Sequence, residues 1–210
     1  MMSSPAVFTL YADSRFTSPY AMSVFVTLTE KGLPFTLQTV DLEAGANRQP
    51  AYAALSLSQR VPLLLDGDFR LAESSAISEY LEQQYPTPAV YPAEVRQRAL
   101  ARQVQAWLRS DLLPLRAQRS TEVVFCRPVD CPLDAAGQQA ADKLFAAASQ
   151  LLAHGGEHLF GDWCIADTDL ALMLQRLLQN GDAVPPRLAD YARRQWQRPS
   201  LQGWLQLPRD

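Results

Sequence analysis

The sequence has few of the side chains that build disulfides or metal sites. Its 210 residues include 3 cysteines and 2 histidines. The cysteines, Cys126, Cys131 and Cys164, form no Cys-x-x-Cys pair. They are too few and too scattered for a disulfide framework, and they leave a zinc site with little to work with. We therefore expect a protein of a reduced, cytoplasmic compartment that holds no metal.

Long apolar runs and an excess of positive charge are also absent. No apolar run approaches the roughly 18 residues of a membrane span, and the first residues lack the basic and apolar segments of a secretory leader. The net charge of −3 provides no basic surface for nucleic acid. The sequence therefore predicts neither a membrane nor a nucleic-acid partner. Its 48% apolar residues suffice for one large domain or two compact ones.

Short apolar runs alternate with helical patterns in the first part of the chain. The expected strands are residues 7–11, 35–42, 61–65 and 69–71, and the expected helices are residues 19–32 and 75–84. The order is strand, helix, strand, then hairpin and helix. This order indicates a thioredoxin-like α/β domain, which we place at residues 5–85.

The second part of the chain shows helical patterns and no convincing strand. Pro86 and Pro88 end the preceding helix, and we place an all-α domain at residues 92–208. The expected helices are residues 94–113, 134–154, 167–179, 186–196 and 200–207. The segment 167–179 is apolar almost all round, which predicts a central buried helix.

Three motifs follow in a fixed order: Thr17-Ser18-Pro19-Tyr20, Gln59-Arg60-Val61-Pro62 and Glu73-Ser74-Ser75-Ala76-Ile77. With a helical second half, they resemble the cytosolic glutathione transferases, with a serine-type active site similar to the tau and zeta classes. The segments WLRSDL (residues 107–112) and WCIADTDLAL (163–172) resemble a bacterial subgroup of that superfamily. The resemblance implies glutathione as cosubstrate, a homodimer, and a ligand cleft between the domains.

Two of these motifs suit the ends of glutathione. Glu73 and Ser74 open a helix, where N–H groups and the helix dipole favour the γ-glutamyl carboxylate, and the Glu73 carboxylate can pair with the ammonium. Val61-Pro62 resembles the cis-proline step of the family, which turns the Val61 backbone toward the cysteinyl peptide unit. Arg48 and Arg60 are candidates for the glycyl carboxylate by the resemblance, with Gln49 as a further candidate.

Ser18 is the candidate catalytic residue. A thiol with a pKa near 8.5 is only about 3% thiolate at pH 7, and a hydroxyl donor with a helix N-terminus can stabilise the thiolate. Ser18 also has the sequence position of an N-cap, and the two roles are compatible. Thr17 is the alternative, because the zeta pattern has adjacent serines here. Serine cannot form a mixed disulfide, so glutathione itself is expected to attack a carbon electrophile or a peroxide.

We expect Phe16, Tyr20, Trp107 and Asp111 to line an electrophile pocket. Trp107 and Asp111 have two alternatives: contact with the partner subunit, or an ordinary helix surface with a tryptophan in the core. Ile165-Ala166-Asp167 resembles the capping box of the family, with Cys164 in place of Ser or Thr, and we assign it to folding.

The predicted function is glutathione conjugation in detoxification, with glutathione-dependent peroxidase activity in oxidative-stress defence. A non-catalytic glutathione-binding or protein-interaction module of the same fold is one alternative. A zeta-like isomerase is another, although its Ser-Ser-Cys signature is not matched here.

Overall fold

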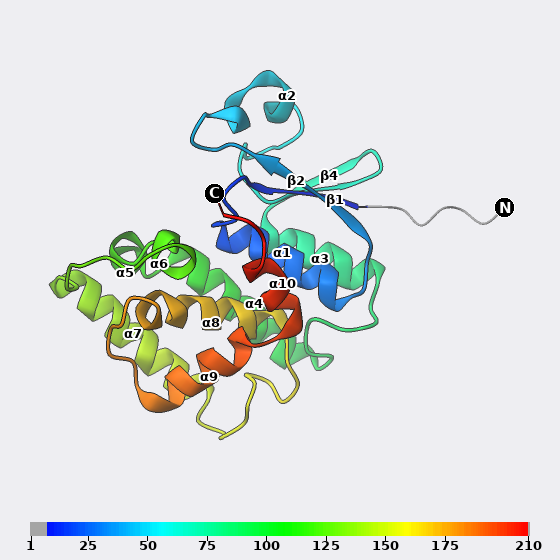
Figure 1. Cartoon of the computed structure of the whole chain (residues 1–210). Helices are drawn as coiled ribbons and strands as arrows, with labels where there is room; N and C mark the ends of the chain where they lie inside the picture. The colour runs from blue at the N-terminus through cyan, green and yellow to red at the C-terminus, as the bar shows by residue number, and fades with distance from the viewer. Residues whose placement is uncertain (1–7, 210) are drawn as a thin grey trace. The chain divides into compact units, whose positions relative to one another are not determined.

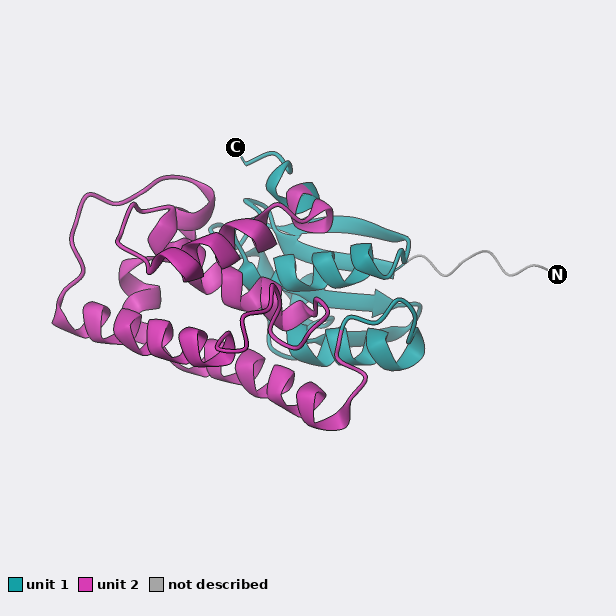
Figure 2. Cartoon of the chain, turned by 90° about the horizontal axis from the view of Figure 1, so that it is seen from below, with its two compact units in different colours: residues 1–90, 203–210 teal, residues 91–202 magenta. Residues whose placement is uncertain are grey.

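The computed structural model describes residues 8–209, which form two compact units (Figure 2). The first unit runs to Val90 and also includes the residues from Gly203 onward, and the second unit spans Tyr91–Gln202.

The first unit contains a four-stranded mixed sheet in the order β2-β1-β3-β4. Strands β1 (Phe8–Asp13) and β2 (Phe35–Val40) are parallel, and helix α1 (Pro19–Glu30) makes the crossover that two parallel strands require. Strand β3 (Leu63–Asp66) runs antiparallel to β1, and β4 (Phe69–Ala72) runs antiparallel to β3.

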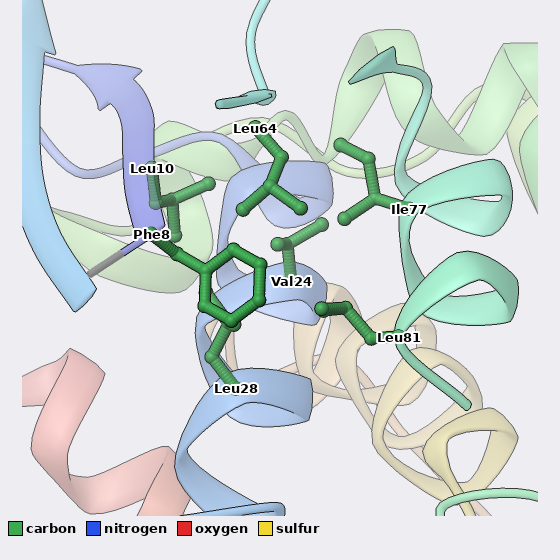
Figure 3. Packing of buried hydrophobic residues seen from close by; sticks show 7 residues of the cluster. All are labelled: Phe8, Leu10, Val24, Leu28, Leu64, Ile77 and Leu81. Atoms are coloured by element: carbon green, nitrogen blue, oxygen red, sulfur yellow. The ribbon is translucent and has the colours of Figure 1, made fainter. Parts of the chain in front are cut away.

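Helices α1 and α3 (Ser74–Gln84) lie side by side on one face of this sheet (Figure 1). Side chains alternate between the faces of a strand, so every second residue of β1, beginning with Phe8 and Leu10, points toward the two helices. Figure 3 shows the buried cluster that results. Its members are Phe8, Leu10, Val24, Leu28, Leu64, Ile77 and Leu81.

The opposite face of the sheet has a second, smaller core. It is built on the 3-10 helix η1 (Ala46–Arg48) and the single-turn helix α2 (Pro50–Ala53). Tyr52 is buried there, and its ring meets that of Tyr11 edge to face at 5.7 Å. The segment between β2 and β3, which the sequence predicts as irregular or briefly helical, therefore covers the second face of the sheet.

The C-terminal residues complete the first unit. Trp204 is fully buried, and its ring lies edge-on to Phe16 at 5.6 Å and to Phe25 at 5.4 Å. Helix α10 (Pro199–Leu205), which carries Trp204, begins in the second unit and ends in the first.

A buried ion pair ties the end of α3 to the segment that follows it. The ammonium of Lys31 lies 2.6 Å from the Glu82 carboxylate and donates to the carbonyls of Tyr85 at 2.6 Å and Pro88 at 2.9 Å. Glu82 also accepts the N–H of Val90 at 3.0 Å. The pair thus fixes residues 85–90 against the end of α1.

The second unit is helical, and within the described part of residues 91–202 its one β feature is an isolated bridge between Phe160 and Asp162. Its helices are α4 (Val95–Ser110), α5 (Leu113–Gln118), α6 (Thr121–Phe125), α7 (Ala135–Leu151), α8 (Ile165–Leu178), α9 (Pro186–Trp196) and the start of α10. Helix α8 packs against α4, α6 and α9 and is buried almost throughout, as its all-round apolar pattern predicts.

Asp167 fixes the start of α8. Its buried carboxylate accepts the N–H of Cys164 at 2.9 Å, the N–H of Leu159 at 2.8 Å and the hydroxyl of Tyr191 at 2.8 Å. The Cys164 thiol occupies the position that a Ser or Thr hydroxyl takes in a capping box. Burial raises the pKa of the Cys164 thiol, so this cysteine stays protonated in a structural position.

The structure splits the helix predicted over residues 94–113. Helix α4 ends at Ser110, and Leu112 adopts a left-handed backbone with φ of 60° before α5 begins. The predicted fold class, a thioredoxin-like α/β domain followed by an all-α domain, is confirmed. Among residues 8–209, no helix combines the length and apolarity that a bilayer crossing needs.

Candidate functional site

The strand register brings the three sequence motifs to one edge of the sheet. Tyr11 of β1 lies opposite Leu63 of β3, and Leu63 lies opposite Ala72 of β4. Because β3 is antiparallel to both neighbours, the end of β1, the start of β3 and the end of β4 coincide. The residues that follow β1, precede β3 and follow β4 therefore share this edge, and they include Ser18, Val61 and the Glu73-Ser74 pair.

The loop after β1 is organised by the carboxylate of Asp13, which is 5% exposed. Its Oδ2 accepts the Thr17 N–H at 2.7 Å and the Thr17 hydroxyl at 2.9 Å. Its Oδ1 accepts the Ser18 N–H at 2.9 Å. Between them, Phe16 adopts a left-handed backbone with φ of 49° and donates its N–H to the Asp13 carbonyl at 3.1 Å.

The two neighbouring hydroxyls differ in what their protons do. The Ser18 side chain caps α1 by accepting the N–H of Ala21 at 3.2 Å, so its oxygen acts as an acceptor. The Thr17 hydroxyl donates to Asp13. A hydroxyl has one proton to donate, and the proton of Thr17 is therefore already in use. The proton of Ser18 remains available to an incoming acceptor.

Side chains from α2 and from the turn after it bind the segment that leads into β3. The Val61–Pro62 peptide bond is cis, and Val61 is buried two residues before the strand begins at Leu63. The carbonyl of Arg60 accepts the hydroxyl of Tyr52 at 2.9 Å and that of Ser56 at 3.3 Å. Burial raises the pKa of Tyr52 to about 12, so its phenol remains a donor at neutral pH.

The start of α3 has an unusual backbone. Glu73 is the N-cap residue, with φ of 72° and ψ of 112°, and its side chain makes no capping hydrogen bond. A residue other than glycine rarely adopts a positive φ, and such residues cluster at ligand sites. Glu73 is exposed, whereas Ser74, the first residue of the helix, is buried.

The candidates for the glycyl carboxylate lie on adjacent segments. Arg48 ends η1, and its neighbour Asn47 donates its side-chain amide to the carbonyl of Gln59 at 2.8 Å. Arg60 follows directly, so the structure brings the backbones of the two arginines near each other. Both arginines are exposed, as is Gln49.

The residues expected to line an electrophile pocket belong to both units. In the first unit, Phe16 is buried against Trp204, and Tyr20 lies half-buried in the first turn of α1. In the second unit, the Asp111 carboxylate accepts the indole N–H of Trp107 at 2.9 Å and pairs with Lys143.

Two residues with clear positions at this edge were missed by the sequence analysis, namely Asp13 and Tyr52. Asp13 is a buried acid at the end of an apolar strand, four residues before a Thr-Ser-Pro helix start, and that signal could have identified it. Tyr52 has no comparable signal, because its hydroxyl acts through a contact eight residues away. Across residues 8–209, no cluster of three or more His, Cys, Asp or Glu side chains is placed to hold a metal ion.

Two family models match the chain. The glutathione S-transferase N-terminal domain matches residues 17–84, and the glutathione S-transferase C-terminal domain matches residues 94–209. Glutathione S-transferase 3 of Zea mays is 31% identical over 196 residues, which cover 89% of this chain and 83% of the maize protein. The chain belongs to the glutathione S-transferase family.

Two further relatives bear on the site. A crystal structure of a glutathione transferase homolog from Burkholderia gl BGR1, with bound glutathione, is 48% identical, has a TM-score of 0.78, and covers 94% of this chain and 96% of its own. Maleylacetoacetate isomerase of Pseudomonas aeruginosa is 41% identical over 109 residues. That match covers 50% of each protein, so the chain spans about half the length of this relative.

Proposed function

We propose that this chain binds glutathione at the edge of the sheet where β1 ends, β3 begins and β4 ends, and transfers it to electrophiles. The observation that supports this best is the register, which gathers Ser18, Val61 and Ser74 at one edge. The glutathione bound in the Burkholderia relative, at 48% identity, supports the same ligand for this chain.

In this proposal each part of glutathione meets a different element. The γ-glutamyl carboxylate lies at the start of α3 on Ser74, and the Glu73 carboxylate pairs with the ammonium. The Val61 backbone, which precedes the first ladder residue of β3, pairs with the cysteinyl unit like an added strand. Arg48 or Arg60 holds the glycyl carboxylate.

Ser18 is the proposed catalytic residue. Its hydroxyl proton is available to the glutathione sulfur, and the N-terminus of α1 adds a favourable dipole. Each pKa unit by which the thiol is lowered requires about 1.4 kcal/mol of preference for the thiolate. The thiolate then attacks an electrophilic carbon, a C–S bond forms, and the leaving group departs with the bonding electrons.

A peroxide substrate is attacked by the same glutathione thiolate at the same position. The thiolate sulfur attacks one oxygen, the O–O bond breaks, and the departing alkoxide takes a proton to become an alcohol. The sulfenic acid of glutathione then reacts with a second glutathione to give the disulfide and water. We propose that in the cell this activity serves detoxification and oxidative-stress defence, carried out by a cytoplasmic homodimer.

Matched substitutions of the two adjacent hydroxyls test the proposal. Ser18→Ala is expected to lower kcat with an aryl halide or an organic hydroperoxide by about 10- to 100-fold and to leave the glutathione Kd within about 3-fold. Thr17→Val is the control and is expected to retain kcat within about 3-fold. Undiminished turnover by Ser18→Ala would remove Ser18 from the mechanism. Tight glutathione binding by the wild type without any turnover would favour a non-catalytic binding module.

A glutathione-dependent isomerase is the second candidate, favoured by the 41% identity to maleylacetoacetate isomerase over 109 residues. In that reaction the thiolate adds to a cis double bond, rotation follows, and the thiolate leaves again. Assaying maleylacetoacetate with and without glutathione separates the candidates. Isomerisation that exceeds aryl halide conjugation by orders of magnitude in kcat/KM would replace the transferase proposal.

A further inference from the structure

We infer that Asp13 is a positioning residue, which selects Ser18 over Thr17 as the hydroxyl that faces the glutathione sulfur. The inference rests on the proposed function, because it requires a glutathione thiolate at the edge of the sheet. It adds a residue outside the three sequence motifs.

Three hydrogen bonds to the Asp13 carboxylate support this inference. One carboxylate oxygen receives two donors from Thr17, and the other receives the N–H of Ser18 at 2.9 Å. The residue is the last of β1, 5% exposed, and its position is therefore fixed by the sheet. An ionised carboxylate accepts hydrogen bonds at both oxygens, which is the arrangement that three converging donors require.

Because of these contacts, the hydroxyl proton of Thr17 is used within the protein, whereas that of Ser18 is not. The Thr17 hydroxyl donates its proton to Asp13 at 2.9 Å. Ser18 is held by its backbone N–H, and its oxygen accepts from Ala21, so its own proton can be donated to a sulfur. Without Asp13, the Thr17 hydroxyl could also donate to the ligand, and Ser18 would keep its helix cap but lose the backbone hydrogen bond that fixes it to the end of β1.

An effect of Asp13 through its charge and an effect through positioning Ser18 would shift the pKa of the bound glutathione thiol in opposite directions. A carboxylate acting only through its charge would disfavour a nearby thiolate, so removing that charge would lower the pH at which the thiolate forms. A carboxylate acting by positioning Ser18 favours the thiolate, so removing it would raise that pH. The direction of the shift therefore separates the two explanations.

The test is an ultraviolet titration of the thiolate of bound glutathione in wild type, Asp13→Asn, Thr17→Val and Ser18→Ala. An amide offers one acceptor oxygen where the carboxylate offers two, so Asp13→Asn loses the hydrogen bond from the backbone N–H of Thr17 or of Ser18, both of which Thr17→Val keeps. We expect Asp13→Asn to raise the midpoint by about 1 pH unit, a tenfold loss of thiolate below the midpoint. Thr17→Val is expected to leave the midpoint within about 0.3 units.

A double variant shows whether Asp13 acts through Ser18. Asp13→Asn is expected to have no further effect on the midpoint in the Ser18→Ala background, because the two changes remove the same interaction. If Asp13→Asn does not fold, Asp13→Glu replaces it, since it keeps the charge and displaces the carboxylate, and the same rise is expected. An unchanged stability with a raised midpoint would support positioning most directly.

Three outcomes would overturn the inference, and they are distinguishable. If Asp13→Asn leaves the midpoint unchanged or lowers it while Ser18→Ala raises it, Asp13 has no positioning role and the proposed function of Ser18 stands. If Asp13→Asn raises the midpoint equally with and without Ser18, Asp13 acts by another route. If Ser18→Ala itself does not move the midpoint, the proposed function and this inference fail together.

Discussion

Replacing Lys31 by methionine should be one of the most destabilising single changes in the first unit. The ammonium of Lys31 is fully buried, and it holds the Glu82 carboxylate and the carbonyls of Tyr85 and Pro88. Methionine keeps the length and much of the volume of the side chain and removes the charge. The substitution therefore leaves a carboxylate that is 4% exposed without its cation.

The magnitude follows from the cost of an unpaired buried charge. Removing one partner of a buried ion pair costs about 3–5 kcal/mol, largely because the other charge remains buried. The carbonyls of Tyr85 and Pro88 also lose a donor, but Tyr85 is half-buried and Pro88 is exposed, so water can replace that donor at little cost. We expect Lys31→Met to lower the free energy of unfolding by about 3–5 kcal/mol, as measured by urea denaturation followed by fluorescence and circular dichroism.

Two comparisons make this prediction specific. Arg15→Met breaks a pair with Glu43 that is largely exposed, and it should cost less than about 1 kcal/mol. The double variant Lys31→Met/Glu82→Leu removes both buried charges and should recover roughly half of the loss. A loss below about 1 kcal/mol for Lys31→Met, or a double variant less stable than Lys31→Met, would show that the buried ion pair does not determine the stability of this region.

Three further predictions concern stability and binding. The hydrogen bond from Lys143 lowers the pKa of Asp111 from 3.8 to about 2, so its contribution to stability is present above about pH 4 and is lost as the pH falls through 2. Asp111→Asn should therefore be less stable than wild type at neutral pH and approach it near pH 2, and a difference independent of pH would contradict this. Leu10→Ala in the core between the sheet and its helices should cost about 2–5 kcal/mol in denaturant unfolding. Leu57→Ala, at a side chain that is 98% exposed, should change stability by less than about 0.5 kcal/mol, and equal losses at the two leucines would be inconsistent with this core. Arg60→Ala should raise the glutathione Kd several-fold by calorimetry with kcat little changed, and a kcat loss without a Kd change would exclude a purely binding role.

Local patterns were enough to predict the fold class. Short apolar runs predicted each strand of the sheet, and Ser18-Pro19 predicted the start of α1, where Ser18 is indeed the N-cap. These signals are local because the period of a strand and the chemistry of a helix cap depend on a few adjacent residues.

The polar contacts over longer distances were not predictable in this way. Lys31 and Glu82 are far apart in sequence, and nothing local indicates that they meet. The helical pattern through residues 94–113 continues across Leu112, whose positive φ depends on tertiary packing rather than on propensity.

Trp204, predicted within the all-α domain, belongs to the first compact unit, where it packs on Phe16 and Phe25.

The candidate site shows the same division. The motifs named Ser18, Val61, Glu73 and Ser74, and the strand register accounts for why they share an edge. Asp13 was missed because its importance lies in three hydrogen bonds across a loop, whose shape depends on the left-handed backbone of Phe16. In that geometry the Thr17 hydroxyl donates to Asp13 and the Ser18 oxygen accepts from Ala21, a difference that the motif alone does not show.

We propose that Ser18 donates its hydroxyl proton to glutathione bound at this edge of the sheet, and a crystal structure of the chain with glutathione would show this contact. We expect the sulfur within hydrogen-bond distance of Ser18 Oγ, the γ-glutamyl carboxylate at Ser74, and Thr17 Oγ1 still bonded to Asp13. A sulfur that contacts Thr17 Oγ1, or glutathione bound away from Val61 and Ser74, would contradict it.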